Sequence, residues 1–350
     1  IFIVYRIIGG IGVGLASMLS PLYIAEIAPA KVRGRLVSMN QFAIVFGMLI
    51  VYFVNYYIAK QGDDSWLNTV GWRWMFASET IPAGLFLIML FFVPDTPRSL
   101  VLKSLPEKAL DVLIKVNGLD EGKRILTDIQ NTLFSHSGKL FSFGTSVIVL
   151  GILLSVFQQF VGINVVLYYA PEIFKNMGSG TDASLLQTIV VGAVLLIFTV
   201  LAILTVDKFG RKPLMIIGAL GMAISMFALG TTFFTETLGI MALVFMLLYV
   251  ACFAMSWGPV VWVLLSEMFP NKIRGRAMAL AVAAQWISNY LVSWTFPIMD
   301  KNTFLLEKFN HGFAYWIYGA MSVLAMLLVW KYVPETKGKT LEEMEKIWEK

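Results

Sequence analysis

The stretch "EIAPAKVRGR" at Glu26–Arg35 decides the fold, because "EMFPNKIRGR" at Glu267–Arg276 repeats it with the shared pattern E-x-x-P-x-K-[VI]-R-G-R. The two copies are offset by 241 residues. Gly71-Trp72 matches Gly312-Phe313 at the same offset, and "PDT" at Pro94 matches "PET" at Pro334 at an offset of 240. Self-similarity at a fixed offset indicates an internal structural repeat. The chain therefore contains two related halves.

Apolar runs of about 20 residues recur along both halves, and such runs are long enough to cross a bilayer as helices. Hydrophobic residues make up 58% of the 350, whereas 14% are charged. Soluble domains carry about a quarter charged residues. The expected spans are 1–25, 36–59, 72–93, 144–170, 185–206, 214–234, 240–265, 277–299 and 313–333. This pattern predicts an all-α polytopic membrane protein with nine transmembrane helices.

The repeat also predicts how the helices are grouped. In the second copy four spans precede the Glu–Arg motif, whereas in the first copy only one does. A design with six helices in each half predicts a twelve-helix parent, of which this chain holds nine. We expect a partial N-terminal bundle of three helices, cytoplasmic linker helices, a six-helix C-terminal bundle and a cytoplasmic tail. Their ranges are 1–93, 94–143, 144–333 and 334–350.

Lys and Arg are distributed unevenly between alternate loops, and this asymmetry predicts the orientation. Twenty-one of the 27 lie in one set of loops, and five lie in or beside the other set. The richer set holds both Glu–Arg motifs, the central linker and the tail, and we expect it to be cytoplasmic. The net charge of +5 is thus explained by topology and requires no nucleic-acid partner. The linker is either a solvated connection or a set of helices that latches the two halves.

Several functional classes find no support in the sequence. One cysteine, Cys252, excludes a disulfide framework, and two isolated histidines, His136 and His311, make a metal site unexpected. The sequence lacks a P-loop and a nucleophile–base constellation, which disfavours an enzyme or an ATP-driven pump. We expect no metal and no cofactor other than a coupling proton.

Polar residues without charges interrupt the span "SVFQQFVGINVVLYY" at Ser155–Tyr169. Gln158, Gln159, Asn164 and Tyr168 spread over more than half of the circumference of an ideal helix, which turns about 100° per residue. They cannot share one narrow face unless the helix breaks. We therefore predict a break near Gly162–Asn164, because glycine permits distortion and discontinuous helices form binding sites in transporters. The alternative is that these amides only join neighbouring helices by hydrogen bonds.

Further amides and indoles occur in other spans: Gln41 follows Asn40, Gln285 precedes Trp286, and Trp262 follows the Gly258-Pro259 pair. A proline at this position can open backbone carbonyls. Amides donate and accept hydrogen bonds, and aromatic faces pack against C–H groups. This combination favours a neutral polyhydroxylated ring over an ion.

Five motifs together resemble the sugar porter family of the major facilitator superfamily: "DKFGRKP", "PDTPR", "PETKGKT", "QQFVGINVVLYYAP" and "GPVVWVLLSEMFP". The resemblance covers nearly the whole chain and is strongest to bacterial D-xylose:proton symporters. It implies two six-helix bundles with a sugar site between them, and proton-coupled pentose uptake by alternating access at the bacterial inner membrane. A facilitative uniporter and a transporter-like sugar sensor are the alternatives. We expect a monomer whose partners are a small sugar and the lipid bilayer.

The resemblance also assigns residues. Sugar contacts fall on Gln41, Gln158, Gln159, Asn164, Trp262 and Gln285, with Tyr168 and Trp286 nearby. Two positions depart from the family: Met48 stands where a glutamine is common, and Leu195 stands where xylose symporters carry an asparagine. Both changes remove hydroxyl partners, so the sugar that binds is less determined than the sugar class.

Charged residues at the cytoplasmic ends are expected to form a gate of salt bridges that break when the halves rock apart. The alternative is static anchoring. The gate residues are Glu26, Arg33, Glu79, Asp95, Arg98, Asp207, Arg211, Glu267, Arg274 and Glu335. Prolines follow Glu26 and Glu267, so we expect these carboxylates to bridge to neighbouring helices. Arg6 lies within a span and needs a counter-charge. The resemblance implies that a carboxylate on the first helix of the parent exchanges the coupling proton.

Overall fold

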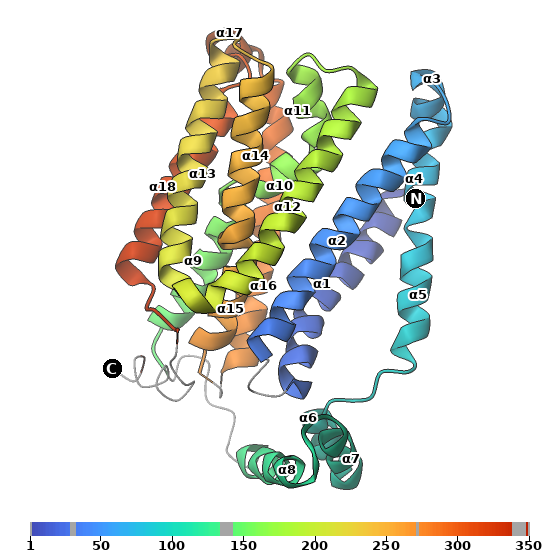
Figure 1. The fold of residues 1–350 in the computed structure, drawn as a ribbon, viewed down its shortest axis with the longest axis vertical. Coiled ribbons are helices and arrows are strands. Elements are labelled where there is room, and N and C mark those ends of the chain that lie inside the picture. Colours follow the sequence, from blue (N-terminus) through green and yellow to red (C-terminus); the bar gives the residue numbers. More distant parts are fainter. Residues whose placement is uncertain (1, 29–32, 134–142, 271–272, 338–347, 349–350) are drawn as a thin grey trace. The chain divides into compact units, whose positions relative to one another are not determined.

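The computed structural model describes residues 2–28, 33–133, 143–270, 273–337 and 348, and the regular elements in these ranges are helices (Figure 1). The chain divides into two compact units. The first unit comprises 1–40 and 62–139, and the second comprises 41–61 and 140–350.

The first unit contains one long helix, the beginning of another, and a series of shorter ones. Its elements are α1 (Phe2–Ile27), α2 (Arg33–Ala59, which continues into the second unit from Gln41), α3 (Asp64–Trp66), the π-helix η1 (Leu67–Gly71), α4 (Trp72–Ser78), α5 (Thr80–Leu90), α6 (Pro97–Leu102), α7 (Pro106–Asn117) and α8 (Leu119–Leu133). The helical run after α2 starts eight residues before the expected span 72–93. The side chain of Asp63 explains this early start, because it accepts from the backbone N–H of Trp66 at 2.8 Å and caps the helix.

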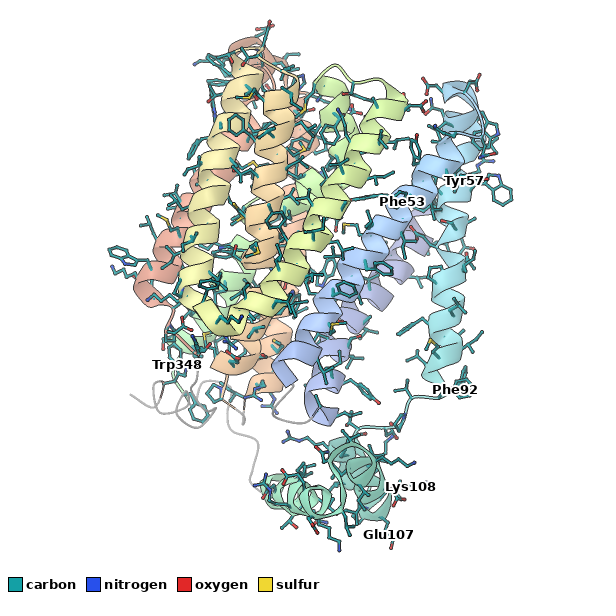
Figure 2. The ribbon with its side chains drawn as sticks, viewed as in Figure 1. Phe53, Tyr57, Phe92, Glu107, Lys108 and Trp348 are labelled. Carbon is teal, nitrogen blue, oxygen red and sulfur yellow. The ribbon has the colours of Figure 1, made fainter. Side chains whose placement is uncertain are left out.

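The linker contains helices α6, α7 and α8 among its described residues, as its helical spacing predicted. Gly118 ends α7 with a φ of +84°, a conformation that glycine adopts at little cost. Helices α6, α7 and α8 pack against one another and bury Ala109 and Leu113 between them. Charged residues such as Glu107 and Lys108 point away from α7 (Figure 2).

The second unit holds the remaining helices. They are α9 (Ser146–Phe160), α10 (Ile163–Tyr168), α11 (Ala170–Asn176), α12 (Thr181–Phe209), α13 (Arg211–Phe234), α14 (Ile240–Met255), α15 (Trp257–Met268), α16 (Arg274–Asp300), α17 (Thr303–Phe309) and α18 (Phe313–Tyr332). Helix α13 packs along α14 and α18, and α9 packs along α16. Small residues allow these close approaches: a Cβ at Gly218 would lie 1.9 Å from Oγ of Ser256, the residue between α14 and α15.

Seven helical segments among the described residues are long and apolar enough to cross a membrane. Of the nine expected spans, 72–93 is divided between α4 and α5, and 277–299 lies in α16, whose polar residues lower its hydropathy. Large apolar side chains are exposed on the long helices, including Phe53 and Tyr57 on α2 (Figure 2). Such a surface is unfavourable in water and suits hydrocarbon.

Candidate functional site

The helix break at Gly162 is the centre of the candidate sugar site, and the prediction of a break there is confirmed. Helix α9 ends at Phe160, Gly162 has a φ of +92°, and α10 starts at Ile163. An L-residue is strained in this left-handed conformation. A side chain at Gly162 would also meet the ring of Tyr318, whose Cγ lies 2.6 Å from the position of a Cβ.

Tyrosine hydroxyls donate to backbone carbonyls that lack a partner within the interrupted helix. Tyr249 donates to the carbonyl of Val161 at 2.7 Å, and Tyr52 donates to the carbonyl of Leu167 at 3.0 Å. In a membrane, non-helical backbone persists only where protein or water satisfies it. These two tyrosines therefore make the broken conformation of this segment stable.

A second break lies on the neighbouring helix, between α14 and α15. Ser256 separates them with a φ of −133° and a ψ of −86°, which is neither helical nor extended, and Pro259 falls in the first turn of α15. Proline is tolerated there because the first N–H groups of a helix have no intrahelical partner. The sequence predicted disruption at Gly258-Pro259, and the structure places it two residues earlier than Gly258.

Gln158 connects the two broken helices. Its Nε2 donates to the carbonyls of Trp257 and Gly258 at 2.9 and 3.2 Å. The side chain is 3% exposed, and its Oε1 has no hydrogen-bond partner within the described residues. A buried acceptor without a donor costs about 1–3 kcal/mol. The amide is therefore fixed by the backbone with its acceptor ready for a ligand hydroxyl.

Gln159 and Asn164 form a second oriented pair across the break. Asn164 Nδ2 donates to Gln159 Oε1 at 2.5 Å. This bond uses the acceptor of Gln159, so its NH2 group is the half that can donate to a ligand. Together with Gln158, the pair presents both an acceptor and a donor from one short segment.

Helix α16 contributes a polar face toward α10. Gln285 is 8% exposed, and its Oε1 also has no hydrogen-bond partner among the described residues. One turn later, Asn289 donates to the hydroxyl of Tyr168 at 3.4 Å and accepts from Ser293 at 3.1 Å. Residues four apart share a helix face. The sequence analysis missed Asn289 and Ser293, although their spacing from Gln285 signals this face.

The other predicted sugar residues lie as follows. Trp262 is half-buried on α15, Trp286 is exposed on α16, and Gln41 is half-buried on α2 within the second unit. At the two positions that depart from the family, Leu195 is buried in the apolar core of this unit and Met48 packs against that core.

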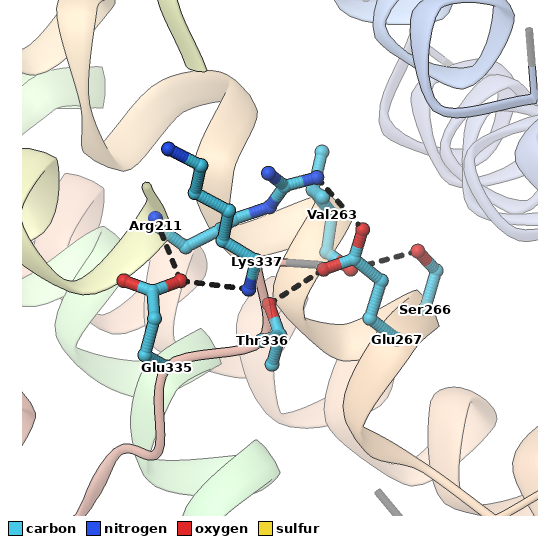
Figure 3. Close-up of polar contacts among 7 residues, drawn as sticks. All are labelled: Arg211, Val263, Ser266, Glu267, Glu335, Thr336 and Lys337. Atoms are coloured by element: carbon cyan, nitrogen blue, oxygen red, sulfur yellow. Dashed lines mark hydrogen bonds and ion pairs between the residues drawn. The ribbon is translucent and has the colours of Figure 1, made fainter. Parts of the chain in front are cut away.

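A second polar cluster joins three elements of the second unit (Figure 3). The guanidinium of Arg211 at the start of α13 donates to Glu267 of α15 at 3.0 Å. Thr336 donates to the other oxygen of Glu267 at 2.6 Å. The prediction that Glu267 bridges to a neighbouring helix is confirmed.

Glu335 caps α13 from a distant part of the sequence. Its carboxylate accepts from the backbone N–H groups of Arg211 and Lys212 at 3.1 and 3.0 Å, where the helix dipole favours negative charge. Burial alone would raise the pKa of Glu335, but backbone N–H donors, with Lys337 foremost, lower it below its ordinary value. The cap is therefore fully charged near neutral pH and is lost as the pH falls through this lowered pKa.

The remaining gate residues do not all join this cluster. Arg274 donates from Nε to the carbonyl of Phe269 at 3.3 Å. Asp95 pairs instead with Lys103 at 2.7 Å, with both side chains about half exposed. Glu79 and Arg98 are exposed and Glu26 is half-buried, whereas the side chains of Arg33 and Asp207 lie outside the described residues.

Arg6 lies on α1 in the first unit. Its guanidinium sits 5.2 Å from the ring centroid of Phe76, a cation–π distance. Within the described residues no salt bridge to Arg6 is present. The predicted counter-charge remains a prediction.

Comparisons with known proteins agree with this architecture. The sequence matches the model of the family described as sugar (and other) transporter over residues 1–348. The D-xylose-proton symporter of Escherichia coli is 65% identical, with 99% of this chain and 72% of that protein aligned. The glucose facilitated diffusion protein of Zymomonas mobilis is 46% identical over 99% of this chain and 74% of that protein.

Solved structures extend the match to three dimensions. The proton:xylose symporter XylE of the major facilitator superfamily, bound to 6-bromo-6-deoxy-D-glucose, gives a TM-score of 0.88 at 65% identity. The alignment covers 99% of this chain and 74% of that chain. XylE from Escherichia coli in an inward open conformation gives 0.83 at 63% identity, covering 99% of this chain and 73% of that one.

Proposed function

Because the chain belongs to the sugar porter family of the major facilitator superfamily, we propose that it carries D-xylose with protons across the bacterial inner membrane. The observation that carries this proposal is the 65% identity to a D-xylose-proton symporter along 99% of the chain. Transport proceeds by alternating access, since relatives of this fold were solved in inward open and partially occluded inward open conformations.

The sugar binds where the broken helices α9–α10 and α14–α15 meet the polar face of α16. Oε1 of Gln158 and Oε1 of Gln285 are buried acceptors that sugar hydroxyls satisfy. The NH2 group of Gln159 donates in return. Rejection of analogues that lack the matching hydroxyl is strong in such a site, because a buried polar group then remains unpaired.

The cluster around Glu267 acts as the gate at the cytoplasmic end of this bundle. The proposal rests on its buried charge: the Arg211 side chain is 9% exposed, and breaking such a pair costs about 3–5 kcal/mol when one partner is removed. Residues 94–143 and the tail from 334 onward are cytoplasmic, as the loop charges indicate. Among the described residues, nine membrane helices are proposed: the seven apolar spans, the run 64–90 and α16.

Replacing Glu267 with glutamine removes the charge that Arg211 faces, and we expect the inward open state to gain population. Accessibility of a cysteine at half-buried Ser266 to a membrane-impermeant thiol reagent from the cytoplasmic side, in a Cys252→Ser background, should rise at least about fivefold. Glu121→Gln is the matched control, because it removes the same charge from an exposed pair with Arg124. Equal accessibility in the two variants would show that the cluster is a static anchor.

Sugar uptake by the full-length protein tests both substrate and coupling. We expect D-xylose accumulation to be greater at pH 6 than at pH 8 and to collapse when an uncoupler is added. D-glucose and L-arabinose serve as competitors. Equilibration without accumulation, insensitive to the uncoupler, would instead identify a facilitative uniporter, the activity for which the Zymomonas mobilis relative is named. An absence of any sugar flux would overturn the proposal.

A further inference from the structure

One buried carboxylate joins three elements of the second unit at the end opposite the Glu267 cluster. Asp300 is the last residue of α16 and is 8% exposed. Its Oδ1 lies 2.7 Å from Nδ1 of His311, in the loop before α18. Its Oδ2 accepts from Nδ2 of Asn176, the last residue of α11, at 3.3 Å. The carboxylate therefore holds the ends of α11 and α18 to the end of α16.

The surroundings of His311 make its protonation depend on Asp300. Helix α13 contributes the ring of Phe233, which lies edge-on to the imidazole at 6.1 Å, and α18 contributes Tyr315, which stacks on Phe233. The charged residues nearest in sequence or at the neighbouring helix ends are exposed. They are Glu172, Lys175, Glu236, Lys301, Glu307 and Lys308. Among the described residues, Asp300 is the charged group that raises the pKa of His311, first through its hydrogen bond and then through its charge.

The direction of the pH dependence follows from this pairing. The hydrogen bond with Asp300 raises the pKa of His311, although burial opposes the shift. A group whose folded-state pKa is raised contributes fully below the ordinary value of about 6.5. Its contribution is lost as the pH rises through the raised pKa. The imidazolium–carboxylate ion pair therefore strengthens the link in acid, whereas at higher pH only a hydrogen bond between the neutral imidazole and the carboxylate remains.

We propose that His311, Asp300 and Asn176 form a pH-responsive strap that holds α11 and α18 to α16 in acid and loosens as the pH rises. The strap acts on the sugar site, because α11 continues α10, which carries Asn164 and Tyr168, while α16 carries Gln285. On the proposed topology this end of the second unit lies on the non-cytoplasmic side of the membrane. Coupling protons arrive from that side. Its effect on sugar affinity rests on the proposed function, whereas the strap itself does not.

The first test needs no sugar. The sequence contains two histidines, so nuclear magnetic resonance of protein labelled with ¹³C-histidine gives two titrating signals, assigned with His136→Gln. We expect His311 to titrate above about 6.5, and to fall in pKa when Asp300→Asn removes its partner. Amide exchange of α11, corrected for the intrinsic effect of pH, should show at least about fivefold greater protection at pH 5.5 than at pH 8.

His311→Gln is the decisive variant, because glutamine keeps a donor for Asp300 but cannot take up a proton. Its α11 protection should not change with pH, whereas His136→Gln should behave like the unmodified protein. An unshifted titration of His311, or equal pH dependence with and without it, would overturn the strap.

The second test measures D-xylose affinity at the two pH values. Affinity should be at least about threefold tighter in acid in the unmodified protein, with no such difference in His311→Gln. If no sugar binds while the exchange result holds, only the proposed function fails.

Discussion

Replacing Gln158 with alanine should weaken D-xylose binding by at least about 100-fold while the full-length protein remains folded. Its Oε1 is a buried acceptor without a partner among the described residues, and its NH2 group is fixed by two carbonyls. Losing a ligand hydrogen bond and leaving polar groups unpaired costs about 3 kcal/mol together. Each 1.4 kcal/mol corresponds to about tenfold in affinity.

Isothermal titration calorimetry measures this change, and size-exclusion chromatography reports whether the variant is folded. Gln61→Ala is the matched control, since Gln61 is an exposed amide that donates only within its own helix end. A second variant, Gln158→Glu, places a carboxylate oxygen against the carbonyls of Trp257 and Gly258 and should bind equally poorly. Unchanged xylose affinity in Gln158→Ala would remove this residue from the site.

The largest loss of stability is expected for Gly162→Ala. Two costs add at this position: a left-handed backbone, about 1–2 kcal/mol for an L-residue, and a collision with the ring of Tyr318. Tyr318 is buried and cannot move aside freely. Overpacking of a tight core adds about 1–3 kcal/mol. We therefore expect a free energy of unfolding lower by about 2–5 kcal/mol, measured by reversible denaturation in detergent.

Gly178→Ala separates the two costs. Gly178 has a φ of +91°, nearly that of Gly162, but a Cβ there would meet no atom within 4 Å. This variant should lose only the backbone contribution. If the collision is real, Gly162→Ala should destabilise a Tyr318→Ala background less than it destabilises the unmodified protein. Equal destabilisation by Gly162→Ala and Gly178→Ala would show that Tyr318 yields without cost.

The helical architecture and the break at Gly162 could be predicted because both depend on local pattern. Apolar runs of sufficient length specify helices in a membrane, and amides that cannot share one face require an interruption. The start of the helix at Asp64 was missed, because it depends on the capping side chain of Asp63 rather than on apolar periodicity. The position of the second break at Ser256, rather than at Gly258-Pro259, also could not be predicted. A proline is tolerated in the first turn of a helix, so Pro259 does not itself mark where the helix is interrupted.

For the site, the identity of the residues could be predicted, but their hydrogen-bond partners could not. Amides within spans signalled Gln158, Gln159, Asn164 and Gln285 by their cost in hydrocarbon. Their hydrogen-bond orientation required partners distant in sequence: Trp257 lies 99 residues from Gln158. For the same reason, Thr336 could not be foreseen as a partner of Glu267. Composition indicates that a polar group is present, and only the packed helices determine which of its atoms remains available.

Three consecutive residues that follow α18 each bind a different earlier helix. Glu335 caps α13, Thr336 binds Glu267 on α15, and Lys337 donates from Nζ to the carbonyl of Lys208 near the end of α12 at 2.6 Å. A ribosome delivers those helices before it delivers residues 335–337. This end of the bundle therefore forms these hydrogen bonds only late in synthesis. Chains that end at Tyr332 should be cleaved by proteases at this end faster than the complete chain is.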